Sequence, residues 1–310
     1  MRLSASRCLV STSAVCFAVG AAAVMTGCTF ETNAAGSLPP GVTVGVSQSR
    51  SGSAAGELEV AVANGANGAN GANGANGANG ANQALTVTAL TLSSGQFKSP
   101  AIWPKESTTI RSGVTANLRV PLPAADCSSA DSTPSVVLRF RLPGEKEQVA
   151  TVRPTDTLDQ LGPIRAAECL ARDAGERVVI TANRRPKIST SAGGAIATLE
   201  LDVTPASHSG SVTVVAARGT TLFSLVEATS GARSGRTPLD ITFGSTGSPA
   251  ILKLNLVPGR CDAHAVAEDK LGTVFPLEVL LEDGTSGVVK IASTSAVRAA
   301  LFDFVALACS

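Results

Sequence analysis

The chain has 310 residues, with 25 Lys and Arg against 24 Asp and Glu, and its ten aromatic residues are nine Phe and one Trp. This near-neutral charge argues against a general nucleic-acid-binding protein, which needs a basic surface to neutralise phosphates. The few rings argue against an aromatic platform for sugars or bases. The hydrophobic share of 44% is enough for a core, and the length is typical of two domains.

The first 27 residues have the pattern of an export signal. Arg2 and Arg7 precede an apolar stretch, 9–25, that contains no charge. The sequence Met25-Thr26-Gly27-Cys28 that follows resembles the bacterial lipobox, in which small residues precede a lipidated cysteine, although Met25 replaces the usual Leu. The alternative is a transmembrane anchor, but the stretch is short for crossing a bilayer. We therefore expect residues 1–27 to be a lipoprotein signal peptide and Cys28 to anchor the chain in the membrane through lipid.

Residues 28–83 are rich in Gly, Ala, Ser and Asn, and Ala63–Gly80 is six copies of Ala-Asn-Gly. Gly at every third position is typical of collagen, but the triplets lack the Pro of a triple helix. This composition predicts a flexible tether. The segments Val42–Val46 and Glu57–Val62 alternate like strands, so a short hairpin inside the tether is an alternative.

Residues 84–310 have the pattern of an all-β protein. Short runs rich in Val, Leu, Ile and Thr alternate with Gly, Pro, Asp and Ser, without a βαβ pattern, and this favours sandwiches over a parallel sheet. Asp283-Gly284 and Arg218-Gly219 lie where hairpin turns are expected. The predicted strands are Leu85–Leu92, Val114–Val120, Val136–Leu142, Glu147–Val152, Arg177–Ala182, Ala197–Val203, Ser211–Ala216, Thr221–Val226, Leu239–Phe243, Ile251–Val257, Phe275–Leu281 and Val288–Ala292.

A weak internal repeat divides this part into two units. A Leu-rich strand with Pro precedes Cys127 and another precedes Cys261, and each is followed by a strand, a hairpin and a final cysteine, Cys169 or Cys309. We expect two tandem immunoglobulin-like β-sandwich units, 84–172 and 173–310. The Trp and Tyr that mark true antibody-type domains are missing at the corresponding positions.

The cysteines fit an exported protein. Two are removed with the signal, Cys28 takes the lipid, and an even number remains, which predicts two disulfides. The repeat selects Cys127 with Cys169 and Cys261 with Cys309. A metal site is the alternative, but cysteine ligands usually come in close pairs, and these do not.

One polar segment, Arg260–Lys270, offers residues for ligand binding. Asp262, His264, Glu268 and Asp269 could supply oxygen and nitrogen ligands, and His264 and Glu268 would share a face if the loop were helical. The other interpretation is a solvated loop held by Cys261.

Catalysis has little support in the sequence. There is no Gly-x-Ser-x-Gly elbow, and the chain has two His. We expect no enzyme activity and no cofactor; an unrecognised hydrolase is the weakest alternative.

The segment from Pro258 to Pro276 is similar to one in uncharacterised exported proteins of high-GC Gram-positive bacteria. Together with the lipobox, this resemblance implies an actinobacterial-type surface lipoprotein, and it implies no activity. We therefore expect a lipid-anchored, extracytoplasmic protein whose non-catalytic head binds a protein or cell-wall partner and no nucleic acid. The alternative is a solute- or metal-binding lipoprotein that uses Asp262–Asp269.

Overall fold

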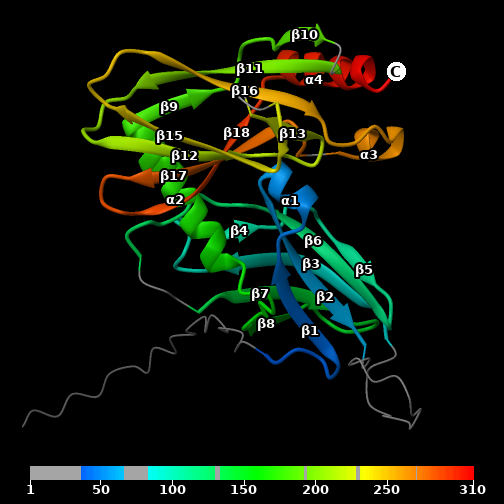
Figure 1. Cartoon of the computed structure of the whole chain (residues 1–310). Helices are drawn as coiled ribbons and strands as arrows, with labels where there is room; N and C mark the ends of the chain where they lie inside the picture. Colours follow the sequence, from blue (N-terminus) through cyan, green and yellow to red (C-terminus); the bar gives the residue numbers. More distant parts are fainter. Residues whose placement is uncertain (1–35, 66–82, 130–132, 192–193, 228–230, 270) are drawn as a thin grey trace, which may run out of the picture. The chain divides into compact units, whose positions relative to one another are not determined.

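The computed structural model describes residues 36–65, 83–129, 133–191, 194–227, 231–269 and 271–310. The predicted signal peptide, the lipobox with Cys28 and most of the Ala-Asn-Gly repeats lie outside these residues. The described chain is mostly β-structure arranged in sandwiches (Figure 1), as the sequence predicts.

The first sandwich consists of two antiparallel sheets that share one core. Alternating apolar residues of both sheets meet in that core, which includes Trp103 and Phe140. One sheet has the order β1 (Val42–Ser47), β2 (Glu57–Asn64), β6 (Val114–Pro121). The other has the order β4 (Ala101–Ile102), β3 (Leu85–Ser93), β7 (Ser135–Arg141), β8 (Gln148–Val152), with β5 (Thr108–Ile110) paired to β3.

The β1–β2 pair corrects the predicted tether of residues 28–83. Strand β2 pairs with β1 on one side and β6 on the other, so it is the central strand of its sheet. Its Leu58, Val60 and Val62 are fully buried. The strand alternation therefore decides the structure here, because it supplies an apolar face that the first core needs. Helix α1 (Arg50–Ala55) connects the two strands and begins at Ser49, whose hydroxyl accepts from the Gly52 N–H at 3.0 Å.

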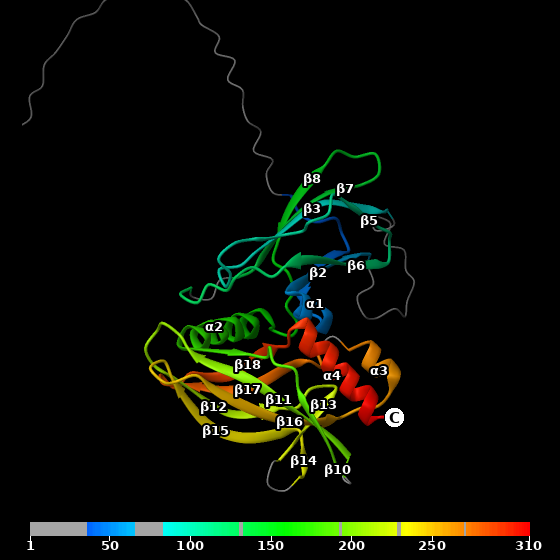
Figure 2. The ribbon, with the colours of Figure 1, turned by 90° about the horizontal axis from the view of Figure 1, so that it is seen from above.

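The second sandwich also has two sheets. The six-stranded sheet has the order β10 (Lys187–Ser191), β11 (Gly194–Pro205), β16 (Ala250–Pro258), β13 (Phe223–Val226), β14 (Arg233–Ser234), with β9 (Val178–Thr181) paired to β11. The four-stranded sheet has the order β15 (Arg236–Gly244), β12 (Ser211–Arg218), β17 (Val274–Leu281), β18 (Ser286–Ala292). Figure 2 shows helix α4 (Ser295–Ala308) lying against this sandwich.

Helix α2 (Leu161–Arg177) contributes to both cores. Leu161 near its start belongs to the first core, whereas Leu170 and Ala174 belong to the second. The predicted unit boundary between residues 172 and 173 therefore falls inside a helix. The two sandwiches share an element, which the repeat did not predict.

All twelve predicted strands are present, but helices α2 and α4 were not predicted. In α4, Val297, Leu301 and Phe304 are fully buried, and the Phe304 ring stacks on Phe223 with centroids 6.3 Å apart. The helix therefore closes the second core with an apolar stripe.

One of the two predicted hairpin turns is correct. Gly284 has φ +87° between β17 and β18, which are paired. Gly219 is different, because the chain crosses there from β12 in one sheet to β13 in the other. Its N–H donates to the Gly235 carbonyl at 2.8 Å.

Candidate functional site

The polar residues of Asp262–Asp269 are spread over a short helix and the loop that follows it. Helix α3 (Ala263–Ala267) is present, and His264 and Glu268 are both exposed. Asp262 accepts from the His264 N–H at 2.8 Å, so its carboxylate caps the backbone. Within the described ranges, no group of three His, Cys, Asp or Glu is placed to hold a metal ion.

Asp269 has a structural role. Its carboxylate accepts from the Thr221 hydroxyl and from the Gly272 N–H. A Cβ at Gly272 would overlap side-chain atoms of both Asp269 and Leu222, so a larger residue there would displace them. Asp269 therefore fixes the loop to the start of β13.

Both disulfides that the repeat selects are present. Cys127 pairs with Cys169, and Cys261 with Cys309, at Cα–Cα distances of 5.7 Å and 5.5 Å. The second bridge holds the polar loop to the end of helix α4, where the sequence analysis placed no helix.

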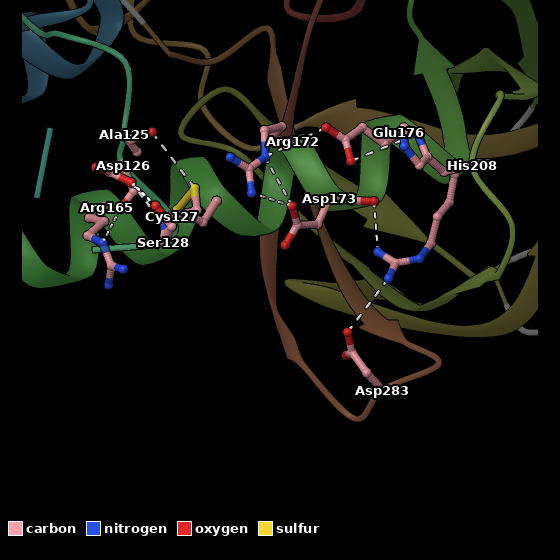
Figure 3. A network of polar contacts seen from close by, with 12 residues as sticks. Ala125, Asp126, Cys127, Ser128, Arg165, Arg172, Asp173, Glu176, His208 and Asp283 are labelled. Carbon is pink, nitrogen blue, oxygen red and sulfur yellow. Dashed lines mark hydrogen bonds and ion pairs between the residues drawn. A yellow bond between two sulfur atoms is a disulfide. The ribbon is translucent and has the colours of Figure 1, made fainter. Parts of the chain in front are cut away.

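Polar contacts line helix α2 (Figure 3). At the disulfide end, the Arg165 guanidinium donates to the carbonyls of Asp126 and Ser129, both at 2.7 Å. The hydroxyl and N–H of Ser128 hold the pKa of the Asp126 carboxyl below its usual range. These bonds and the bridge to Cys169 fix the 125–129 loop on the helix.

The other end of α2 contacts the second sandwich. Arg177 donates to the Asp173 carbonyl at 2.8 Å and lies 3.6 Å from the Asp283 carboxylate. His208 lies 4.0 Å from Glu176, and both side chains are exposed (Figure 3). These contacts join the C-terminal part of α2 to the second sandwich.

The outer face of the four-stranded sheet carries a charge cluster of Glu278, Arg218 and Arg236. Glu278 on β17 accepts from Arg236 at 2.8 and 2.9 Å and from Arg218 at 2.6 Å. Hydrogen bonds from Arg236 and then Arg218 lower the pKa of Glu278 to about 2. All three charges are satisfied within the cluster, which therefore braces β12, β15 and β17.

A groove in the second sandwich lies between its two sheets and is lined by residues of β13, β15 and β16. We call it the β15–β16 groove; its volume is about 400 Å³. This size falls within the range of small ligand sites. The groove is lined by Leu225, Thr237, Pro238, Leu239, Lys253 and Leu254, among others.

The floor of the groove is apolar and its rim is polar. Leu225 and Leu254 belong to the second core, and Leu239 packs against it. Lys253 is exposed at the rim. The Thr237 hydroxyl is buried and has no hydrogen-bond partner among the residues that the structure describes. A buried polar group without a partner is costly, so Thr237 is a position where a bound molecule would gain a hydrogen bond.

Strand edges border this groove. Among the residues that the structure describes, β13 pairs with β16 only at Leu256–Pro258, although β16 begins at Ala250. Within the same residues, strand β15 pairs only with β12. Alternation identifies strands but does not show where a neighbouring strand ends, so this groove could not be predicted from the sequence.

Cys28 lies outside the described residues, so its lipidation stays a prediction. None of the described helices is long and apolar enough to cross a membrane.

Comparisons with known proteins add little. No protein-family model matches the chain, and no curated protein matches it. Among solved structures, the YadV chaperone matches at 13% identity, with 76% of this chain and 92% of that chain covered and a TM-score of 0.18. The CsuC–CsuE chaperone–tip adhesion subunit pre-assembly complex from archaic Csu pili of Acinetobacter baumannii matches at 8% identity, with coverage of 77% and 93% and a TM-score of 0.15. Similarity this low supports no conclusion about function.

Proposed function

We propose that this chain is an exported, lipid-anchored protein whose head binds a protein partner without catalysis. The observation that carries the binding function is the β15–β16 groove, with its apolar floor and the uncovered strand edges beside it. An apolar cleft with a few polar groups is the usual form of a binding site. The two disulfides support an oxidising compartment outside the cytoplasm.

The lipobox resemblance supports the location. Acyl chains on Cys28 would hold the head at the outer face of the cytoplasmic membrane, and several chains together anchor more firmly than one. We expect Cys28→Ala to leave an unprocessed precursor or to release the protein from the membrane. A processed Cys28→Ala protein that still partitions fully into the detergent phase would refute lipid anchoring.

The binding function is tested by photo-crosslinking in the cells that express the anchored chain. A photoreactive phenylalanine analogue replaces Lys253 at the groove or, as the matched control, Val179, which is exposed on β9 of the same sheet. We expect discrete protein adducts from position 253 and none from position 179. Equal adducts from both positions, or none from position 253, would contradict a binding site at the groove.

A further inference from the structure

We propose that the β15–β16 groove binds an extended peptide segment of its partner. This segment adds as an antiparallel strand to Ala250–Leu254 of β16, called here the uncovered part because no strand among the described residues pairs with it on the β13 side. This inference rests on the proposed binding function and names the chemistry of the partner. The occupant is a polypeptide with alternating apolar residues, held by main-chain hydrogen bonds and by an apolar side chain in the groove.

The direction of the backbone groups on β16 supports this inference. In an antiparallel strand, the backbone groups of alternate residues point to opposite neighbours. Gly259, which follows β16, donates its N–H to the Leu222 carbonyl on the β13 side at 2.7 Å. Odd-numbered residues of β16 therefore point their N–H and C=O groups toward β13. Ile251 and Lys253 are two of these residues, and they lie before Leu256, where the pairing with β13 ends.

This part of β16 is regular enough to act as a template. It pairs with β11 from Ala250 to Leu256 without a bulge. Its side chains alternate between exposed Ile251 and Lys253 and buried Leu252 and Leu254. Lys253 stands opposite Glu200 of β11, on the outer face of the sheet. A regular, uncovered edge of this kind offers pairing to another chain.

Several other edges of the second sandwich carry features that block pairing. Strand β15 contains Pro238, a register shift near its middle, and Asp240 with φ +48°. Helix α2 packs along β18, and β14 has two residues. Strand β10 has five residues and one charged residue, Lys187, as the Ala250–Leu254 part of β16 does. The β15–β16 groove, which is lined by Lys253 and Leu254, distinguishes the edge of β16 from that of β10.

The groove beside this edge selects for apolar side chains. A strand added to β16 would turn alternate side chains toward the interior, where Leu225 and Leu254 form the floor. The opposite wall carries the unpartnered Thr237 hydroxyl, which a peptide group could satisfy. Ala250–Leu254 spans about 16 Å of strand, so about five peptide residues would be bound.

The test uses the full chain, purified in detergent, and the fluorescein-labelled peptide Glu-Val-Thr-Leu-Thr-Val-Glu. Paired residues carry their side chains on the same face of a sheet. The partners of Ile251 and Lys253 are therefore the outward Thr residues, while Val and Leu enter the groove. N-methylation of the two Thr removes the donors that face β16, whereas N-methylation of Leu and the first Val leaves those donors in place.

We expect fluorescence anisotropy to show binding of the unmodified peptide. We expect the Thr-methylated peptide to bind about tenfold more weakly than the Val- and Leu-methylated one. Equal binding of the two methylated peptides, or no binding by the unmodified peptide, would overturn the inference.

A protein variant tests the same edge from the other side. Lys253→Pro removes the outward N–H without removing a bond to β11, and Lys253→Ala removes the side chain but keeps that N–H. We expect Lys253→Ala to bind the peptide at least about tenfold more tightly than Lys253→Pro. Equal affinities of the two folded variants would overturn strand addition. If the proline variant does not fold, the methylated peptides decide.

Failure of this inference is separable from failure of the proposed function. If crosslinks form from position 253 but the peptides do not bind, the groove still binds a protein and strand addition is excluded. Loss of the crosslinks would instead remove the binding function itself.

Discussion

At the scale of single residues, the partly buried carboxylate of Glu278 is held by two guanidinium groups. Glu278 is bound by Arg218 and Arg236, which come from the two strands nearest to β17 on that side of the sheet. The carboxylate is 17% exposed, while both guanidinium groups are about half exposed. The cluster is therefore partly screened by water, and its contribution to stability is smaller than the pKa shift alone would give.

Glu278→Gln tests this cluster. The pKa of Glu278 falls from an ordinary 4.5 to about 2 in the folded protein, so its contribution is complete above about pH 5 and is lost as the pH falls toward 2. We expect the variant to lose about 1–2 kcal/mol at pH 7 and to differ much less from the wild type at pH 2. Urea denaturation at both pH values measures this, with Glu106→Gln in an exposed loop as the control. A stability loss that is equal at the two pH values would show that the charge is not its source.

Asn64 at the end of β2 is a second residue with a defined role. Its Nδ2 donates to the carbonyls of Ile110 and Gln83 at 2.8 and 2.9 Å, and the residue is only 4% exposed. We expect Asn64→Ala to cost about 1–3 kcal/mol, because the Ile110 carbonyl would stay buried without its partner. Trp103 in the same core reports unfolding by fluorescence. Asn117→Ala on β6 is the control, and an equal loss in both would mean that the hydrogen bonds contribute nothing.

At the scale of elements, the longer strands could be predicted from the sequence, whereas helices α2 and α4 and the strands β4, β5, β10 and β14 were not. The strands follow alternation, which survives in short segments such as Phe275–Leu281. The helical signal was also present, because the buried residues of α4 lie at 297, 301, 304 and 305 and Thr294 caps its start. The segment is also apolar at most of its other positions, so composition alone does not separate its buried face from the rest. For β1 and β2, the alternation correctly indicates strands, but the low-complexity composition around them favours a tether, so the prediction for residues 28–83 was wrong here.

Helix α2 has consequences for the first disulfide. If each sandwich were independent, breaking Cys127–Cys169 would affect only the first. Because α2 enters both cores, we expect the Cys127→Ser/Cys169→Ser double variant to weaken both. The chain-entropy model gives a loss of about 4 kcal/mol for a loop of this length.

The experiment compares two probes during thermal unfolding of this double variant. Trp103 fluorescence follows the first sandwich, and amide hydrogen exchange of β16 and β17 follows the second. Both are expected to show lower stability. The matched variant Cys261→Ser/Cys309→Ser, whose bridge lies within the second sandwich, should leave the Trp103 transition less affected. An unchanged second sandwich in the first variant would show that α2 does not couple the two.

At the scale of the whole molecule, the sequence indicated an export signal, a low-complexity segment and a disulfide-bonded β head. The structure moves the boundary between the low-complexity segment and the head. The repeats begin inside the folded head, since Ala63 and Asn64 end β2 and Gly65 donates to the Gly41 carbonyl. Gly65 has φ +141°, and a Cβ there would lie 2.7 Å from the Gly113 nitrogen. The first triplet therefore has a structural role that composition could not reveal, because its residues are the same as in the five copies that follow.

Two deletions of this repeat have different expected outcomes. Removing four triplets, residues 66–77, keeps Asn64 and Gly65 and leaves a five-residue connection to Gln83. The ends of that connection are close, because the Asn64 Nδ2 lies 2.9 Å from the Gln83 carbonyl. If the repeats make no contacts, as their composition predicts, the shorter loop changes stability by about 1 kcal/mol in the favourable direction.

Removing all six triplets, residues 63–80, supplies Ala81 and Asn82 in place of Ala63 and Asn64 but joins that Asn directly to Gln83. No residue then takes the position of Gly65, and the chain must pass from β2 to β3, which lie in different sheets, without a connection. We expect this variant to lose several kcal/mol, because the end of β2 and the buried bonds of its Asn cannot form without strain. Denaturation followed by Trp103 fluorescence compares the two variants with the wild type. Equal stability of the two deletion variants would show that the end of β2 contributes nothing to the folded head. Strong destabilisation by the four-triplet deletion would show that the later repeats are packed.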